Sequence, residues 1–332
     1  MLEFIKKKLY LLYNKVVRLL WDTWCVASVV GIWPRFIEPR MLLTSRLSLP
    51  IDGLSPSLED LKVVFFSDLH FSKEASSKFL KKISSRINKL HPDIIIFGGD
   101  ILRTPIIDDP ERLLSFLNSL KARYGCFFVF GNHDYSEWVS LNDKGEYDIE
   151  TGGTPAIIEG FKRFFGNKKP LGIITDRARA VPSHEELSAL LKKTRFTVLE
   201  NDTSLVPIRN TFLNICGLEE YWLGRCNPKK AFKNYDKKYP GIVVTHNPDS
   251  FPLLYDYPGD LVLSGHTHGG QINLPWMWKK FSLLENSEFK RGMVGRDGKA
   301  IYITRGVGSS EPFRWFSPPE IVLITLNGTS HD

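Results

Sequence analysis

Short apolar runs rich in β-branched and aromatic residues recur along the chain, and five of them end in a polar cluster. Runs of this kind at 63–66, 94–97, 127–130, 242–244 and 261–263 predict buried strands. The clusters that follow are Asp68-Leu69-His70, Gly98-Gly99-Asp100, Gly131-Asn132-His133-Asp134, Thr245-His246-Asn247 and Gly265-His266-Thr267-His268. Because ligand sites collect at the carboxyl ends of strands in layered α/β folds, we predict an α/β fold in which the clusters meet.

The residue types in these clusters indicate a metal site. Aspartate oxygens, histidine nitrogens and an asparagine carbonyl suit Mn²⁺, Fe²⁺ or Zn²⁺ better than Ca²⁺. Two neighbouring ions need a carboxylate that reaches both, and Asp100 is our candidate for this bridge. A single histidine after a strand is usually structural, but five such clusters in order favour ligands. We expect Gly98, Gly131, Gly265 and Gly269 to form turns with positive φ that aim the ligands.

Over about residues 60–326, the motif order Asp-x-His, Gly-Asp-x-x-Asp/Arg, Gly-Asn-His-Asp/Glu, His, Gly-His-x-His resembles the calcineurin-like metallophosphoesterase superfamily. The resemblance implies a four-layer α/β/β/α sandwich of two mixed sheets and two divalent ions, with Mn²⁺ favoured. It assigns one ion to Asp68, His70 and His268, the other to Asn132, His246 and His266, and Asp100 to both.

Two further residues receive catalytic roles. The resemblance implies that His133 faces the phosphate and the leaving oxygen. Arg103 occupies the last position of the second motif, where some members have aspartate, so an Asp-His dyad is not assumed for His133. Arg103 is interpreted either as a phosphate clamp or as an ordinary surface arginine.

The length of 332 residues favours one main domain with insertions. We expect an N-terminal segment at 1–45 and a catalytic domain at 46–332, with an inserted cap at about 136–195. The four cysteines, Cys25, Cys126, Cys216 and Cys226, lack CxxC spacing, which fits a reducing compartment.

The N-terminal segment has the pattern of a basic amphipathic helix. Its apolar positions are Ile5, Leu9, Leu12, Val16, Leu19 and Leu20, and its basic positions are Lys7, Lys8, Lys15 and Arg18. An apolar stretch from Trp24 to Trp33 follows, which we expect to be too short to span a bilayer after the interruption at Asp22. We therefore predict association with the membrane surface. A secretory signal and a helix packed on the catalytic domain are the alternatives.

Two aromatic groups are candidates for substrate contacts. Phe161, Phe164 and Phe165 lie in the predicted cap at helical spacing, and they indicate either packing on the domain itself or a lid for lipid chains. Trp276 and Trp278, beside lysines and close to the last metal motif, suit a boundary between lipid and water, although core packing is the common role of single rings.

The stretches 265–272, 304–308 and 318–321 resemble the membrane-associated bacterial branch of the superfamily. That branch includes lipid A biosynthesis enzymes that hydrolyse UDP-2,3-diacylglucosamine to UMP and 2,3-diacylglucosamine 1-phosphate. The resemblance implies a lipid-linked nucleotide substrate and a peripheral or monotopic position on the cytoplasmic face of the inner membrane. Another membrane-associated phosphoesterase, acting on a phospholipid or nucleotide, and a non-catalytic interaction module are the alternatives. The net charge of +7 suits anionic lipid, and without a nucleic-acid motif we expect neither a nucleic-acid partner nor an obligate protein partner.

Overall fold

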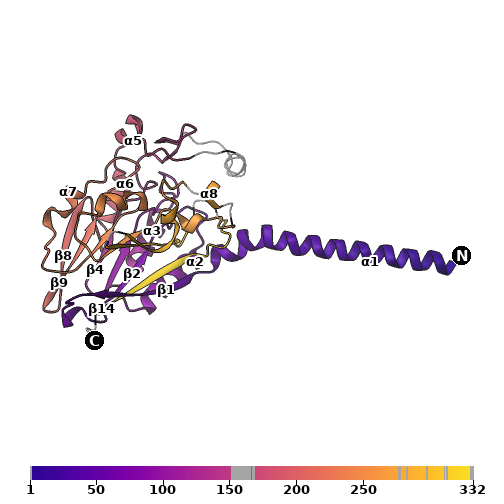
Figure 1. The fold of residues 1–332 in the computed structure, drawn as a ribbon, viewed down its shortest axis with the longest axis horizontal. Helices are drawn as coiled ribbons and strands as arrows, with labels where there is room; N and C mark the ends of the chain where they lie inside the picture. Colours follow the sequence, from indigo (N-terminus) through magenta and orange to yellow (C-terminus); the bar gives the residue numbers. More distant parts are fainter. Residues whose placement is uncertain are drawn as a thin grey trace.

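Two six-stranded sheets form the centre of the protein (Figure 1). The computed structural model describes residues 2–150, 166, 169–275, 278–281, 283–296, 298–309, 311 and 313–329; for residues 2–7, 9–11, 280–281 and 296 it describes the backbone alone. The first sheet has the order β1 (Leu43–Ile51), β14 (Glu320–Gly328), β2 (Lys62–Phe66), β3 (Ile94–Phe97), β4 (Gly125–Phe128) and β7 (Phe196–Val198). Strands β2, β3, β4 and β7 are parallel, whereas β14 is antiparallel to β2.

The second sheet is also mixed. Its order is β12 (Gly292–Arg296), β13 (Lys299–Ile303), β11 (Leu261–Ser264), β10 (Gly241–Val244), β9 (Thr211–Gly217) and β8 (Asp202–Ile208). The four inner strands are parallel, and β8 and β12 pair antiparallel at the two edges. All five strands predicted before the polar clusters are present, although β4 ends at Phe128, two residues earlier than expected.

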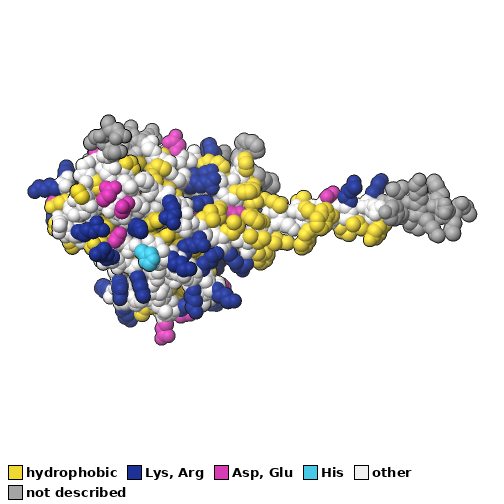
Figure 2. All heavy atoms as spheres, turned by 90° about the horizontal axis from the view of Figure 1, so that it is seen from below, with side chains coloured by type: hydrophobic (Ala, Val, Ile, Leu, Met, Phe, Trp, Pro, Cys, Tyr) yellow, Lys and Arg dark blue, Asp and Glu magenta, His cyan; other side chains and the backbone are white. Residues whose placement is uncertain are grey.

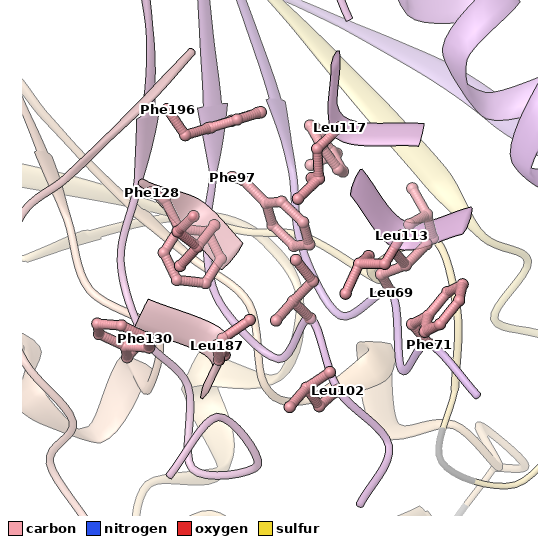
Figure 3. Close-up of a cluster of buried hydrophobic side chains, with 14 of the residues drawn as sticks. Leu69, Phe71, Phe97, Leu102, Leu113, Leu117, Phe128, Phe130, Leu187 and Phe196 are labelled. Atoms are coloured by element: carbon pink, nitrogen blue, oxygen red, sulfur yellow. The ribbon is translucent and has the colours of Figure 1, made fainter. Parts of the chain in front are cut away.

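Alternating side chains of the strands build a layered core. Val63 and Phe65 of β2 pack between the two sheets, whereas Val64 and Phe66 point to the opposite face of the first sheet. That outer face is covered by α2 (Ser77–Lys89), α3 (Pro110–Ser119) and α6 (Glu185–Leu191). Figure 3 shows leucines of α3 and α6 against the phenylalanines of β3 and β4.

Short helices cover the outer face of the second sheet. They include α7 (Pro228–Ala231), η5 (Pro248–Leu254) and η7 (Ser287–Lys290), whose apolar residues pack with Val243 and Val262. The four-layer α/β/β/α arrangement of two mixed sheets is thus confirmed. The remaining short elements are η3 (Pro56–Leu58), α5 (Asp176–Ala180), η4 (Phe232–Asn234), η6 (His268–Gly270) and α8 (Trp278–Phe281).

The segment expected as a cap is partly core. Its described portion holds the hairpin of β5 (Val139–Leu141) and β6 (Tyr147–Ile149), together with α5 and α6. Leu187 and Leu190 of α6 are buried in the cluster on the first sheet, so this end of the segment belongs to the domain. Phe161, Phe164, Phe165 and Trp276 lie outside the described residues.

A long helix leaves the domain at the N-terminus (Figure 1). Helix α1 (Leu2–Ala27) continues as the π-helix η1 (Ser28–Ile37) and the short η2 (Glu38–Arg40). The side chains of residues 12–27 are exposed, for example 65% at Trp21 and 58% at Trp24, so the alternative of a helix packed on the domain is wrong for this stretch. Figure 2 shows apolar side chains along the described part of the helix and at its junction with the domain.

The same helix corrects the prediction about length. The stretch Leu12–Arg40 is long and apolar enough to cross a membrane by length and composition, criteria that a signal sequence near the N-terminus also meets. The prediction that the apolar stretch is too short to span is therefore wrong, because the helix continues past Asp22 and through Pro34.

Candidate metal centre

The structure brings the seven predicted ligand side chains together at one edge of the two sheets. Four of them, together with His133, follow β2, β3 and β4 of the first sheet, and three follow β10 and β11 of the second. Asp100 lies in the middle of the group: its Oδ2 is 3.2 Å from His246 Nε2 and 3.6 Å from His70 Nε2. This central place is the geometry required of a carboxylate shared by two ions.

The residues expected at the first ion form one compact set. The Nε2 atoms of His70 and His268 are 3.1 Å apart, and His268 Nε2 lies 3.8 Å from Asp68 Oδ1. One donor atom from each of the three residues lies within 4.8 Å of the others, so they could hold one cation. Asp68 Oδ2 is buried without a hydrogen-bond partner among the described residues, and a cation would satisfy it.

The residues expected at the second ion form another set. His266 Nδ1 lies 3.0 Å from Asn132 Oδ1 and 3.3 Å from His246 Nε2. His246, His266 and Asp100 again offer donor atoms within 4.8 Å of one another. His246 Nδ1 is 2.7 Å from the carbonyl oxygen of Gly98, which can only accept, so Nδ1 carries the proton and Nε2 offers its lone pair to the site. The donor chemistry and the geometry both fit two divalent cations.

Strained backbone positions hold these side chains in place. Asp68, His70, Asp100, His266 and His268 all have left-handed backbone conformations, with φ between 47° and 69°. Such conformations cost about 1–3 kcal/mol for residues other than glycine and cluster at functional sites. Here five of the candidate ligands themselves have left-handed backbone, as do the neighbouring Gly99 and Gly269.

Three of the four glycines have a different role from the one predicted. Only Gly269 has positive φ, at 63°, so the prediction is wrong for Gly98, Gly131 and Gly265. These three are required for space. A Cβ atom at Gly131 would lie 2.2 Å from Asp100 Oδ1, and one at Gly265 would lie 2.7 Å from Asp68 Oδ2. The close approach of the backbone to the carboxylates therefore explains these glycines.

Burial shifts the pKa values of several groups in the cluster, whereas the pairing of Asp100 with His246 lowers the pKa of Asp100 and raises that of His246. Desolvation lowers the pKa of His70 to about 3 and that of His268 well below its usual value, so these imidazoles are neutral, as metal ligands must be. Desolvation raises the pKa of Asp68 to about 6, and the nearby Asp100 carboxylate adds to the rise. Bound cations would offset this cost of burying charged carboxylates.

His133 lies beside the two ligand sets. Its backbone N–H donates to Asp100 Oδ1 at 3.0 Å, and its Nδ1 lies 2.9 Å from the carbonyl oxygen of Arg103. Since a carbonyl only accepts, Nδ1 carries the proton and Nε2 remains available to a substrate. His133, His70 and Asp100 could also hold a cation, so the geometry fits His133 both as a metal ligand and as a residue that acts on the substrate.

Arg103 points its side chain toward surface carboxylates. Its guanidinium lies 3.1 Å from Glu311 and 3.9 Å from Glu74, and the side chain is 31% exposed. The described contact of Arg103 with the centre is through its backbone oxygen. The role of phosphate clamp stays a prediction. Trp278, the described member of the predicted tryptophan pair, stacks with Lys290, whose Nζ is 3.9 Å from the ring centre.

Several residues near the centre were not found from the sequence. Trp138 packs against His133 in a tilted arrangement with ring centres 4.6 Å apart, and the buried Trp222 meets His266 edge-on at 4.3 Å. The buried guanidinium of Arg314 lies 3.2 Å from His268 Nδ1. None of the three belongs to a ligand motif, and all are brought to the site by tertiary packing. The run of aromatic residues around Arg314 was the one available signal.

Comparison with known proteins agrees with this geometry. Residues 61–270 match the calcineurin-like phosphoesterase family. The chain belongs to this family. It is thus a metallophosphoesterase, of a family that uses divalent metals, and the predicted superfamily is confirmed.

Three relatives indicate the range of functions. The chain is 35% identical to the UDP-2,3-diacylglucosamine pyrophosphatase LpxG of Chlamydia trachomatis over 88% of this chain and 92% of that protein. It is 27% identical to the phosphodiesterase YaeI of Escherichia coli, covering 86% and 87% of the two chains. It is also 27% identical to YkuE, an uncharacterized metallophosphoesterase of Bacillus subtilis, covering 90% of each.

Proposed function

We propose that this metallophosphoesterase hydrolyses the diphosphate bond of UDP-2,3-diacylglucosamine, giving UMP and 2,3-diacylglucosamine 1-phosphate in lipid A biosynthesis. The observation that carries the proposal is the 35% identity to LpxG, which extends over nearly the whole of both chains. The gathered ligand set and the apolar N-terminal helix support it, because the substrate joins a phosphoester to a lipid.

Two divalent ions, which we propose to be Mn²⁺, would occupy the two ligand sets. When bound, they would supply positive charge to the phosphoryl oxygens and lower the pKa of a coordinated water so that it can attack phosphorus. Asp68, His70 and His268 would hold one ion, Asn132, His246 and His266 the other, and Asp100 both. The left-handed backbone at five of these positions fixes their side chains before the substrate binds.

His133 would act on the substrate rather than on the metals. Burial lowers the pKa of His133, so the free ring is neutral with its proton on Nδ1. A bound diphosphate brings negative charge next to Nε2 and favours protonation there. The protonated ring would then stabilise the transferring phosphoryl group and give its proton to the leaving oxygen. The tilted contact with the Trp138 ring would keep the His133 ring in the required orientation.

The N-terminal helix would attach the enzyme to the cytoplasmic face of the inner membrane. Apolar side chains exposed along the helix would lie in lipid, and the basic residues Lys8, Lys15 and Arg18 would meet anionic headgroups. The aromatic residues predicted to contact the acyl chains, Phe161, Phe164, Phe165, Trp276 and Trp278, would form the lipid side of the substrate site.

A second candidate is a phosphodiesterase for another lipid or nucleotide. The similarity to YaeI, which covers 86% of this chain, favours it. This enzyme would have the same metal centre and differ in its substrate contacts. A non-catalytic module is disfavoured, because such a protein would be expected to lose ligands and all seven are in place among the described residues.

A substrate panel tests the proposal. The full-length protein in detergent, with Mn²⁺, is mixed with UDP-2,3-diacylglucosamine, with a phospholipid and with a soluble phosphodiester, and UMP and phosphate products are measured. We expect UMP release from the first substrate, with kcat/KM at least about 10² higher than for the others. Preference for the phospholipid or the soluble diester would replace the proposal by the second candidate.

A further inference from the structure

The base of the N-terminal helix contacts a loop that supports the metal centre. Residues 33–38 of the helix meet residues 313–317, which lie about 280 positions later in the chain. This part of the chain comprises the end of the π-helix η1 and Glu38, the first residue of η2. Pro39, five residues after Pro34, has no N–H, so the carbonyl oxygen of Pro34 has no partner in the π-helical pattern. The carbonyl oxygen of Pro34 accepts from the backbone N–H of Arg314 at 2.8 Å.

Glu38 is the centre of this contact. Its side chain is buried, with a residue exposure of 2%, although its neighbour Trp33 is 38% exposed. The carboxylate accepts from the indole N–H of Trp33 at 2.7 Å and from the backbone N–H of Phe316 at 3.0 Å. It also accepts from the backbone N–H of Ser317. Two of these hydrogen bonds join the helix to the loop, and the third, from Trp33, fixes the carboxylate within the helix.

The loop in turn contacts the ligands of one ion. The hydroxyl of Ser317 donates to the carbonyl oxygen of His268 at 2.6 Å. Arg314 is fully buried and donates to the carbonyl oxygens of Ser317 and Arg305, each at 2.8 Å. Its guanidinium also lies 3.2 Å from His268 Nδ1.

A second series of hydrogen bonds connects Arg314 to Asp68. Arg314 donates to the carbonyl oxygen of Gly308, and the N–H of Gly308 donates to the carbonyl oxygen of Asp68 at 2.7 Å. A Cβ atom at Gly308 would lie 2.1 Å from the carbonyl oxygen of Leu69, so this loop is pressed against the backbone between Asp68 and His70. Asp68 and His268, two residues of the same ligand set, are therefore both supported by the loop that Glu38 holds.

We propose that Glu38 is a positioning residue, which couples the base of the N-terminal helix to the ligand set Asp68, His70 and His268. Left-handed residues such as Asp68 and His268 persist only where their surroundings hold them, and the loop at 313–317 supplies that support. The proposal does not depend on which phosphoester is the substrate. It also implies that a single loop, residues 313–317, connects the candidate metal centre to the base of the helix that we propose to attach to the membrane.

Glu38→Gln in the full-length protein tests this coupling. The amide has one oxygen instead of two, so it cannot accept all three N–H groups. Glu59→Gln is the matched control, because the exposed Glu59 accepts one backbone N–H, from Gly328 at 2.9 Å, at the far end of β14. Mn²⁺ binding is followed by titration and by electron paramagnetic resonance, which separates a coupled pair of ions from a single ion, and no substrate is present.

We expect Glu38→Gln to weaken one of the two ions by about tenfold or more and to leave the other unchanged, as for other residues that orient metal ligands. The coupled signal should give way to that of a single ion, and the amides of 313–317 should exchange hydrogen faster in metal-free protein. Glu59→Gln should match the wild type. Two ions bound with wild-type affinity in Glu38→Gln, or an equal weakening of both ions, would overturn the proposal.

Trp33→Phe provides a second test if Glu38→Gln fails to fold. It removes one donor to the same carboxylate and keeps a ring in place. We expect a smaller loss at the same ion, and unchanged binding of both ions in this variant would refute the coupling. The readout of this test is metal binding. A negative result would therefore refute the coupling through Glu38 without bearing on the proposed substrate, and a negative substrate assay would refute the proposed substrate without bearing on the coupling.

Discussion

Gly131→Ala should disrupt the metal centre by steric contact alone. The added Cβ would lie 2.2 Å from Asp100 Oδ1, 2.5 Å from the backbone nitrogen of Asp100 and 2.8 Å from His246 Cε1. These atoms belong to a buried carboxylate, to the backbone and to a buried ring, so none of them can move freely. The expected result is displacement of Asp100 and loss of the shared ligand.

The size of the effect follows from packing. Inserting one methyl group into a filled interior costs about 1–3 kcal/mol, and the rigid neighbours here place Gly131→Ala at about 3 kcal/mol. With an unfolding entropy of about 2.1 cal/mol/K per residue, a chain of 332 residues loses about 4 °C in Tm. Affinity for Mn²⁺ should fall by at least about tenfold, because Asp100 is expected to serve both ions.

Thermal unfolding of the full-length protein in detergent, with EDTA and then with Mn²⁺, measures both effects. Gly295→Ala is the matched control, since its new Cβ would meet one atom at 3.9 Å and the residue lies in the edge strand β12. The control should keep the wild-type Tm and metal affinity. A Gly131→Ala variant with the same Tm and two bound ions would refute the packing argument.

Four other predictions can be checked with the same preparation. Asp100→Asn should lose the thermal stabilisation by Mn²⁺ and nearly all hydrolysis, as measured by metal analysis and UMP release; two retained ions would exclude it as the shared ligand. His133→Ala should keep both ions and lower kcat by about 10²–10⁴, whereas loss of an ion would make His133 a ligand. Arg103→Ala should change kcat by less than about threefold because the guanidinium pairs with surface carboxylates, and a loss near 10² would instead support the phosphate clamp. Deleting residues 2–31, which keeps the helix base, should release the protein from vesicles of anionic lipid without loss of metal; retention on the vesicles would place the membrane contact elsewhere.

The sequence predicted the part of the fold that depends on local pattern. Apolar runs such as 63–66 and 94–97 are long enough to identify strands β2 and β3. The polar residues that follow them mark the end of the strands at which the candidate ligands lie. The parallel direction of these strands then forces the clusters together. The candidate ligands within these clusters were assigned by the resemblance to the calcineurin-like family.

Tertiary contacts could not be predicted in the same way. Pro34 normally indicates the end of a helix, yet the chain continues through it as a π-helix. The role of Gly131 depends on the distance to Asp100, which lies on another strand. Trp222 and Glu38 have no motif around them, and their contacts join segments far apart in the chain. Such residues become visible only when the packing is known.

The count of metal ions in active protein tests the central claim most directly. Full-length protein that releases UMP would be analysed for metal content and by electron paramagnetic resonance, before and after chelation. The account predicts two Mn²⁺ ions per chain with a coupled signal, and loss of UMP release when the ions are removed and its return when they are restored. One ion per chain at full activity, or full activity after complete removal of metal, would contradict it.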